Sequence, residues 1–214
     1  GLIRTLLLKR FESSAKAFEA SCEDLLLKLL YFVRLHNPKT AQRWEDQNEE
    51  LMARIRQHRR MRGWQRGEEA EEDQDEDIIP EEFKKKIEKL DERRYNVSDM
   101  VMESLLDLDQ LAEFLEELAD FDTAQDSKLQ ALLGLLQGDP TLRKHKVLIF
   151  TEYMATARYL ERELRQARIG PLDEVDSMSR RDRSAIIRSF SPYYNGSSSA
   201  ELADDAVTGI RVLI

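Results

Sequence analysis

The chain has 214 residues, of which 35% are charged, 41% are hydrophobic and one is a cysteine. No apolar run approaches the roughly 18 residues that a membrane-spanning helix needs, which argues against a membrane partner. The single cysteine excludes an internal disulfide and suits a reducing compartment. We therefore expect a cytoplasmic, helix-rich protein, large enough for one or two domains.

The net charge of −9 is unevenly distributed. Residues 68–77 contain eight carboxylates and no basic side chain, so the rest of the chain carries a charge of about −1. Residues 143–190 hold eleven Lys and Arg against seven Asp and Glu. Because phosphate groups are bound by local basic surface, the acidic total does not argue against a nucleic-acid partner.

The N-terminal third predicts two long helical stretches. Residues 2–36 are expected to form one long helix or a closely joined pair, because apolar side chains recur every three or four positions. These are Leu7, Phe11, Ala15, Phe18, Cys22, Leu25, Leu29 and Phe32. Asn37 precedes a proline, which disfavours continuation of the helix, and a second helix is predicted over residues 40–61.

The middle of the chain predicts a solvated loop followed by three helices. Residues 63–79 are acidic and poor in apolar side chains, which favours a mobile loop. A regulatory acidic latch over the neighbouring arginines is the other interpretation. Helices are predicted over 80–90, 96–121 and 126–136 from their apolar spacing, their Asn or Asp caps and the proline at position 80.

The last part predicts a β-α-β-α-β arrangement. Residues 147–150 are four consecutive apolar residues, a pattern typical of a parallel strand covered by helices on both faces. The further elements are a helix starting at Met154, a strand at 172–175, a helix at 180–190 and a strand at 209–214. Such crossovers between parallel strands are nearly always right-handed.

Several short stretches together carry a resemblance. They are residues 146–153 (KVLIFTEY), the Arg-x-x-x-Ile-x-x-Phe pattern of Arg183, Ile187 and Phe190, residues 10–14 (RFESS), and residues 191–196 with 210–214. They resemble motif IV, the helix after it, the opening of the second motor lobe and the approach to motif V of Swi/Snf-type superfamily-two helicase-like ATPases. The similarity is to the bacterial, RNA-polymerase-associated remodeller-like branch.

The resemblance implies a fold and a domain organisation. The expected fold is α/β with a large all-α section, in which a helical insertion precedes a partial RecA-like parallel sheet of about three strands. Residues 1–36 would open the second lobe, 37–125 would form the insertion, and 126–214 would be the first half of the RecA-like lobe. Because there is no initiator methionine, we expect the chain to be a part of a longer protein that ends here just before motif V.

The resemblance also implies partners and cofactors. The longer protein would hydrolyse ATP with Mg²⁺ against a first RecA-like lobe of the same chain and translocate double-stranded DNA. The chain by itself is expected to bind no cofactor and to have no catalytic residue. It contains no Gly-x-x-x-x-Gly-Lys-Ser/Thr loop and no Asp-Glu pair after an apolar strand. His36, His58 and His145 lack the spacing and the cysteine neighbours of a metal site, so no metal ligand is predicted.

Four residues are predicted to contact nucleic acid. In an open parallel sheet, ligands bind beyond the carboxyl ends of the strands, and Thr151 and Tyr153 follow the first strand at the start of a helix, where free amides favour an anion. The resemblance implies that this anion is the nucleic-acid backbone, in contact with Thr151 and Tyr153, and that Arg180 and Arg183 on the next helix also lie near it. Thr151 as an ordinary helix cap, and the arginines as solvated side chains, are the alternatives left open.

A different class of function also remains open. The chain can be interpreted as a non-enzymatic helical protein-interaction module, in which the β-α-β-α-β end is only a docking platform. The long helical section and the lack of a complete catalytic site favour this interpretation.

Overall fold

The structure, a computed structural model, describes residues 2–65, 79–175, 182–196 and 209–214. It divides into two compact units. The helical unit comprises Gly1–Leu7 and Phe18–Asp120, and the α/β unit comprises Leu8–Ala17 and Phe121–Ile214. None of the helices in these described ranges combines the length and the apolar character that a membrane crossing requires.

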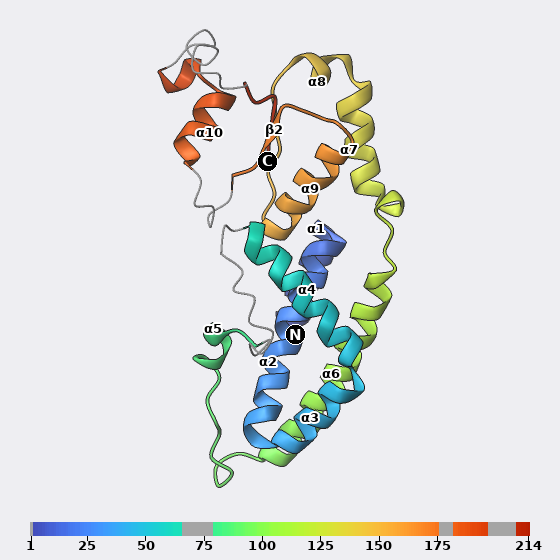
Figure 1. Ribbon diagram of the computed structural model, residues 1–214, viewed down its shortest axis with the longest axis vertical. Coiled ribbons are helices and arrows are strands. Elements are labelled where there is room, and N and C mark those ends of the chain that lie inside the picture. The colour runs from blue at the N-terminus through green and yellow to red at the C-terminus, as the bar shows by residue number, and fades with distance from the viewer. Residues whose placement is uncertain (1, 66–78, 176–181, 197–208) are drawn as a thin grey trace. The chain divides into compact units, whose positions relative to one another are not determined.

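The helices carry most of the chain (Figure 1). Two helices have residues in both units, α1 (Leu2–Ser13) and α2 (Ala15–His36). The helical unit also contains α3 (Pro38–Gln47), α4 (Glu49–Gln65), α5 (Glu81–Lys84) and α6 (Val97–Ala119). The later helices are α7 (Ser127–Gly138), α8 (Pro140–Lys144), α9 (Met154–Gln166) and α10 (Arg183–Phe190), with 3-10 turns at Thr123–Gln125 and Tyr193–Asn195.

Short polar side chains begin several of these helices, as the sequence predicts. Asn37 accepts a hydrogen bond from the Thr40 amide at the start of α3, and Asn96 and Asp126 do the same for α6 and α7. Asp139 begins α8 by accepting from two backbone amides, and these bonds lower the pKa of its carboxyl group. Capping of this kind satisfies amides that have no partner inside the helix.

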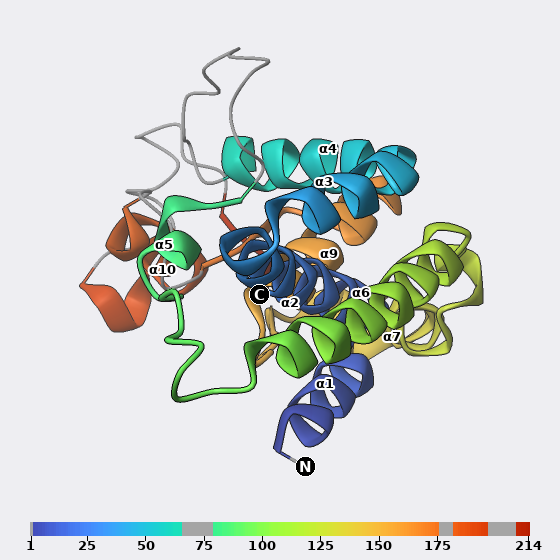
Figure 2. The same cartoon turned by 90° about the horizontal axis from the view of Figure 1, so that it is seen from below.

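The helical unit is organised around one hydrophobic core. Figure 2 shows α2, α3, α4 and α6 grouped together, and their apolar side chains form a single buried cluster. The fully buried apolar side chains that α2 contributes to this cluster are Cys22, Leu26, Leu27, Leu30 and Val33, each with 0% of its surface exposed. The buried stripe therefore follows a line shifted from the predicted one, and Phe11, expected inside, is 55% exposed.

Two predicted helices of the helical unit differ from the structure. The helix expected over 40–61 is interrupted at Asn48. Its side-chain amide donates to the Trp44 carbonyl and so competes with the backbone amide of Asn48, which makes the regular helical bond to the same oxygen. The helix expected over 80–90 ends at Lys84. Beyond it, the Leu90 amide donates to Nε2 of His36 instead of continuing a helix.

The α/β unit contains a three-stranded parallel sheet, which confirms the predicted strand direction. The strands are β1 (Val147–Leu148), β2 (Leu172–Asp173) and β3 (Val212–Leu213), in the order β1-β3-β2. Val147 and Leu172 both align with Val212, and Leu148 and Asp173 both align with Leu213. The last strand in the chain is therefore the central strand of the described sheet.

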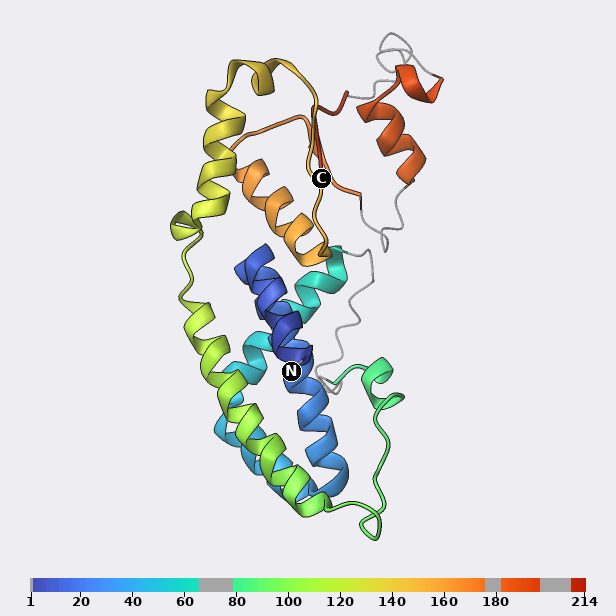
Figure 3. The same ribbon diagram turned by 180° about the vertical axis from the view of Figure 1, so that it is seen from behind.

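Helices cover the two faces of this sheet (Figures 1 and 3). Val212 and Ile214 pack into a cluster with side chains of α7 and α9, whereas Leu213 packs with Ile186 of α10. Neighbouring residues of a strand point to opposite faces, so α9 and α10 lie on opposite sides. This follows from right-handed crossovers, because the chain moves two places across the sheet through α9 and one place back through α10.

The prediction that both faces of residues 147–150 are covered was wrong. Val147 and Ile149 pack into the cluster under α9, but Leu148 is 46% exposed and Phe150 is 86% exposed. The physical reason is that β1 lies at an edge of the described sheet, while α10 covers β3. The predicted acidic loop lies mostly outside the described residues.

Candidate nucleic-acid interface

The candidate site lies where β1 passes into α9. Thr151 and Tyr153 connect the carboxyl end of β1 to Met154, the first residue of α9. Tyr153 is the N-cap residue of α9, and its side chain makes no capping hydrogen bond. The first turn of α9 contains no acidic residue. The positive end of a helix dipole therefore lies at the edge of a parallel sheet where ligands bind in related architectures.

Three hydroxyl groups meet beside this helix start. The Oγ1 atom of Thr156, in the first turn of α9, lies 2.9 Å from Oγ of Ser13 and 2.9 Å from Oγ of Ser14. Ser14 Oγ also accepts a hydrogen bond from the Ala17 amide, 3.0 Å away. We call Ser13, Ser14 and Thr156 the hydroxyl cluster. Because three hydroxyl protons serve two contacts inside the cluster, one proton remains to donate to another acceptor.

The hydroxyl cluster lines a pocket of about 340 Å³ within the α/β unit. The remaining lining residues come from α7, the end of β1 and α9. They are Asp126, Lys128, Leu129, Leu132, Phe150, Thr151, Glu152, Tyr159 and Leu160. The pocket is thus built by three stretches far apart in the sequence, and it is large enough for a phosphate group with part of its sugar.

Two basic side chains make contacts between residues 10–12 and the region of this pocket. The guanidinium of Arg10 lies over the Tyr153 ring, 4.9 Å from its centroid, a favourable cation–π arrangement. Lys128 Nζ donates to the carbonyl oxygen of Glu12. These contacts place two positive charges near the start of α9, where an anion would be bound.

Two carboxylates also line the pocket and limit what it can bind. Asp126 is already engaged, because it accepts from the Leu129 amide at 3.0 Å and from the Tyr159 hydroxyl at 2.9 Å. Burial raises the pKa of Tyr159, and the neighbouring carboxylate of Asp126 raises it further, so the tyrosine remains a donor. Glu152 is exposed and can turn towards solvent.

The pocket offers hydroxyl donors and the ammonium group of Lys128 beside two carboxylates, but no catalytic grouping. Its lining contains serine and threonine hydroxyls without a histidine or a cysteine, so no activated nucleophile is present among these residues. What the arrangement can do is bind an oxyanion through hydroxyl groups, a helix start and nearby basic side chains.

The structure describes three of the four predicted site residues. Thr151 lines the pocket, and its Oγ1 accepts from the Tyr153 amide at 3.4 Å. Arg183 is the first residue of α10 and is exposed. The N-terminal ends of α9 and α10 both lie at the lower edge of the sheet in Figure 1, on its opposite faces. Arg180 lies outside the described residues.

The sequence did not single out the hydroxyl cluster as part of the site. Ser13 and Ser14 belong to a stretch that carries only the family resemblance, and no pattern in the sequence assigns Thr156 a role. The available signal was a pair of hydroxyl residues at the end of one helical pattern. Nothing in the spacing relates them to a threonine more than 140 residues later.

Removing the Thr156 hydroxyl should measurably lower the stability of the α/β unit. We expect Thr156→Val to lower the free energy of unfolding by about 1–2 kcal/mol, because Ser13 and Ser14 lose their shared partner in a partly buried place. Thr156→Ser, which keeps the hydroxyl, should lose less. Urea unfolding followed by circular dichroism measures both, and equal losses would show that the hydroxyl contacts contribute nothing.

No protein-family model, curated protein or solved structure matches this chain.

Proposed function

We propose that the α/β unit is the incomplete second motor lobe of a Swi/Snf-like, ATP-driven translocase, and that its pocket contacts the phosphate backbone of double-stranded DNA. In this proposal the helical unit is an insertion, and a first RecA-like lobe would complete the motor. The proposal is supported by the parallel order β1-β3-β2 with helices on opposite faces.

A contact between distant parts of the chain supports the proposal in addition to the sheet. The hydroxyl cluster joins residues 13 and 14 to the first turn of α9 through two contacts of 2.9 Å. The two stretches that resemble the lobe opening and motif IV therefore meet in one pocket. Serine and threonine hydroxyls together with a helix start are common donors to DNA phosphates.

The residues of this chain do not fit ATP and Mg²⁺ as a complete site. The sequence has no phosphate-binding glycine loop with its lysine, and the pocket has no paired carboxylates after a strand to hold a metal ion. We therefore assign no step of ATP hydrolysis to these residues. Their part in the proposed motor is to hold the backbone of the nucleic acid.

A substitution of Arg183 tests the proposal. We expect Arg183→Glu to weaken binding of a short DNA duplex by several-fold and to reduce the slope of log affinity against log salt by about one. The physical reason is the loss of one phosphate contact and the gain of a like charge. Fluorescence anisotropy between about 50 and 200 mM salt measures both quantities.

A matched control exists on the same helix. Arg188→Glu makes the same charge change on α10, in its last turn instead of its first. If binding depends on the edge of the sheet where α9 and α10 begin, Arg188→Glu should have the smaller effect. Equal losses for both variants would indicate general charge repulsion, and an unchanged affinity for Arg183→Glu at low salt would contradict the proposal. A duplex RNA of the same length tests the preference for DNA.

One observation favours the interaction-module alternative. On α6, Met102 is 61% exposed and Leu106, one turn later, is 58% exposed, which gives the helical unit an apolar strip on its surface. Neighbouring apolar side chains of this kind are typical of helix-partner surfaces. Under this alternative, the chain would show no salt-dependent binding of DNA in the anisotropy measurement.

A further inference from the structure

The helical unit contains a compact group of three side chains that the proposed function does not use. Glu19 and Glu23 lie on α2 and His58 lies on α4. Both glutamates are buried, with 7% and 1% of their surface exposed. Burying two carboxylates is costly unless positive charge or strong hydrogen bonds compensate them. His58 and the further interactions of both glutamates supply such compensation here.

The helices bring these residues together for simple geometric reasons. Glu19 and Glu23 are four positions apart and therefore lie on the same face of α2. Next to His58, Arg59 forms a 2.8 Å ion pair with Asp24, which also holds α4 against α2. Cys22 is fully buried in the same stretch. Side chains from two packed helices are a common source of metal ligands in helical proteins.

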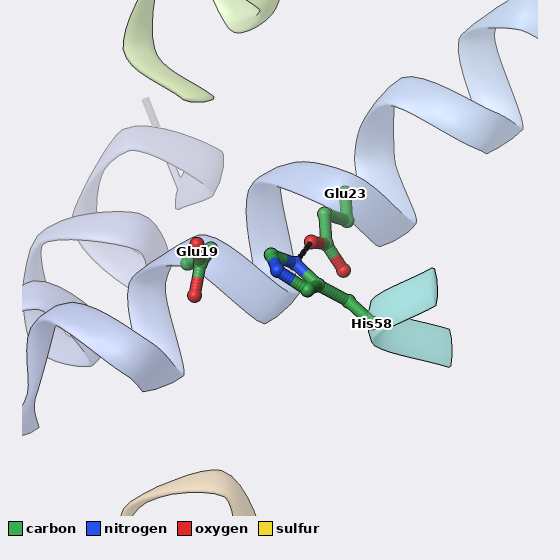
Figure 4. Close-up of side chains that lie close together, drawn as sticks. All are labelled: Glu19, Glu23 and His58. Carbon is green, nitrogen blue, oxygen red and sulfur yellow. Dashed lines mark hydrogen bonds and ion pairs between the residues drawn. The ribbon is translucent and has the colours of Figure 1, made fainter. Parts of the chain in front are cut away.

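The potential ligand atoms of the three side chains lie close to one another. One potential ligand atom from each of the three residues can be chosen so that all lie within 4.8 Å of one another. His58 Nδ1 is 2.7 Å from Oε1 of Glu23, and Figure 4 shows the imidazole extending from α4 towards both glutamates of α2. Bonds of about 2.0–2.2 Å to a central ion place ligand atoms about 3–4 Å apart, so the side chains would have to rotate to bring separations of up to 4.8 Å into that range.

We propose that Glu19, Glu23 and His58 bind one divalent transition-metal ion of the zinc class, which links α2 to α4. One imidazole nitrogen and two carboxylate oxygens suit Zn²⁺ and similar ions, whereas Ca²⁺ and Mg²⁺ prefer oxygen ligands alone. The His58 side chain is 31% exposed, which provides an entry path. Three protein ligands leave a coordination position for water.

Binding has a chemical consequence that can be measured. The imidazole must be neutral to coordinate the ion, and the ion replaces the hydrogen bond between His58 and Glu23. When Nδ1 is the ligand, the one remaining ring proton is on Nε2, and a doubly protonated ring releases one proton to solvent. Both glutamates also take part in other interactions, which the ion would partly replace. Affinity should therefore fall as the pH is lowered and protons compete for the same atoms.

The proposed site differs from the expectation from the sequence. His58 has no second histidine or cysteine at a ligand spacing, so the sequence predicted no metal site. The glutamates lie about 35 positions away and were hidden among many carboxylates. Only the packing of α4 on α2 relates them.

The test is titration of the whole chain with Zn²⁺ by calorimetry, at two pH values. We expect one tight site per chain and weaker binding at the lower pH. His58→Gln and Glu19→Gln should each weaken that site at least about tenfold, as expected when a ligand is lost. Asp24→Asn is the matched control: it removes a neighbouring carboxylate of α2 that pairs with Arg59, and it should leave the affinity within about twofold.

Folding is checked separately so that each outcome is decisive. Fluorescence of the buried Trp44 reports whether the helical unit of each variant is folded, and only variants with the native signal are compared. Zn²⁺ should also raise the unfolding temperature of the wild type more than that of His58→Gln. The eight carboxylates of residues 68–77 also attract cations. Binding of Zn²⁺ to the wild type therefore does not by itself establish the proposed site. Equal affinities in the wild type, His58→Gln and Glu19→Gln would show that the group is only an ion pair and would overturn the proposal.

Discussion

Leu108→Ala is expected to lower the free energy of unfolding of the helical unit by about 2–5 kcal/mol, the range seen when a buried leucine is cut back to alanine. Leu108 on α6 is fully buried in the cluster that also contains side chains of α2, α3 and α4. Its removal costs the transfer free energy of the lost methyl groups and also leaves a cavity. Urea unfolding followed by tryptophan fluorescence measures the effect, because both tryptophans of the chain belong to the helical unit.

Leu106→Ala is the matched control for this prediction. Leu106 is on the same helix, two positions away, and is 58% exposed. The change in helix propensity is identical, so the difference between the two variants isolates burial. We expect Leu106→Ala to change stability by no more than about 0.5 kcal/mol. Similar losses for both variants would mean that α6 does not present Leu108 to the core.

Val212→Asp is expected to prevent the α/β unit from folding. Val212 is fully buried in the central strand, where it aligns with Val147 on one side and Leu172 on the other. An aspartate there would place an unpaired carboxylate between apolar side chains, at a cost of several kcal/mol. Hydrogen exchange measures the outcome, because the amides of Val147 and Ile149 donate to carbonyl groups of the β3 segment and should lose their protection.

Leu148→Asp tests the same conclusion from the edge strand. Leu148 aligns with Leu213, but it is 46% exposed on the face that α10 does not cover at β1. The aspartate can therefore remain in water, and we expect a loss of no more than about 1 kcal/mol. If Leu148→Asp were as damaging as Val212→Asp, the face of β1 described as exposed would have to be covered in solution.

The positions of β1 and β3 in the sheet show which features of the strands the local sequence predicts and which it does not. Residues 147–150 are an apolar run without polar alternation, which predicts a strand covered on both faces, whereas 209–214 contains Arg211 and predicts only a third strand. Their order in the sheet depends on which way each crossover moves, and the local pattern does not contain that information. The structure places 212–213 in the centre and 147–148 at an edge, and only the central strand is buried on both faces.

The candidate interface shows a similar division. The place of Thr151 and Tyr153 in the fold could be predicted, because they directly follow an apolar run and precede a helical pattern, and the structure has them between β1 and α9. That they contact nucleic acid stays a prediction. The hydroxyl cluster could not be predicted, because Ser14 and Thr156 meet only after α9 folds against the start of α2. The proposed metal ligands follow the same rule, since His58 reaches Glu23 through helix packing.

The sequence by itself determined the elements whose cause is local. Caps such as Asn96 and Asp126, apolar spacing along α6 and the helix break at Asn37 each depend on a few neighbouring residues, and the structure contains them nearly as predicted. Tertiary structure alone decided which apolar strand is central, which face of α2 is buried and which polar side chains meet. These depend on contacts between residues far apart in the chain, whose free energy is gained only when whole elements pack together.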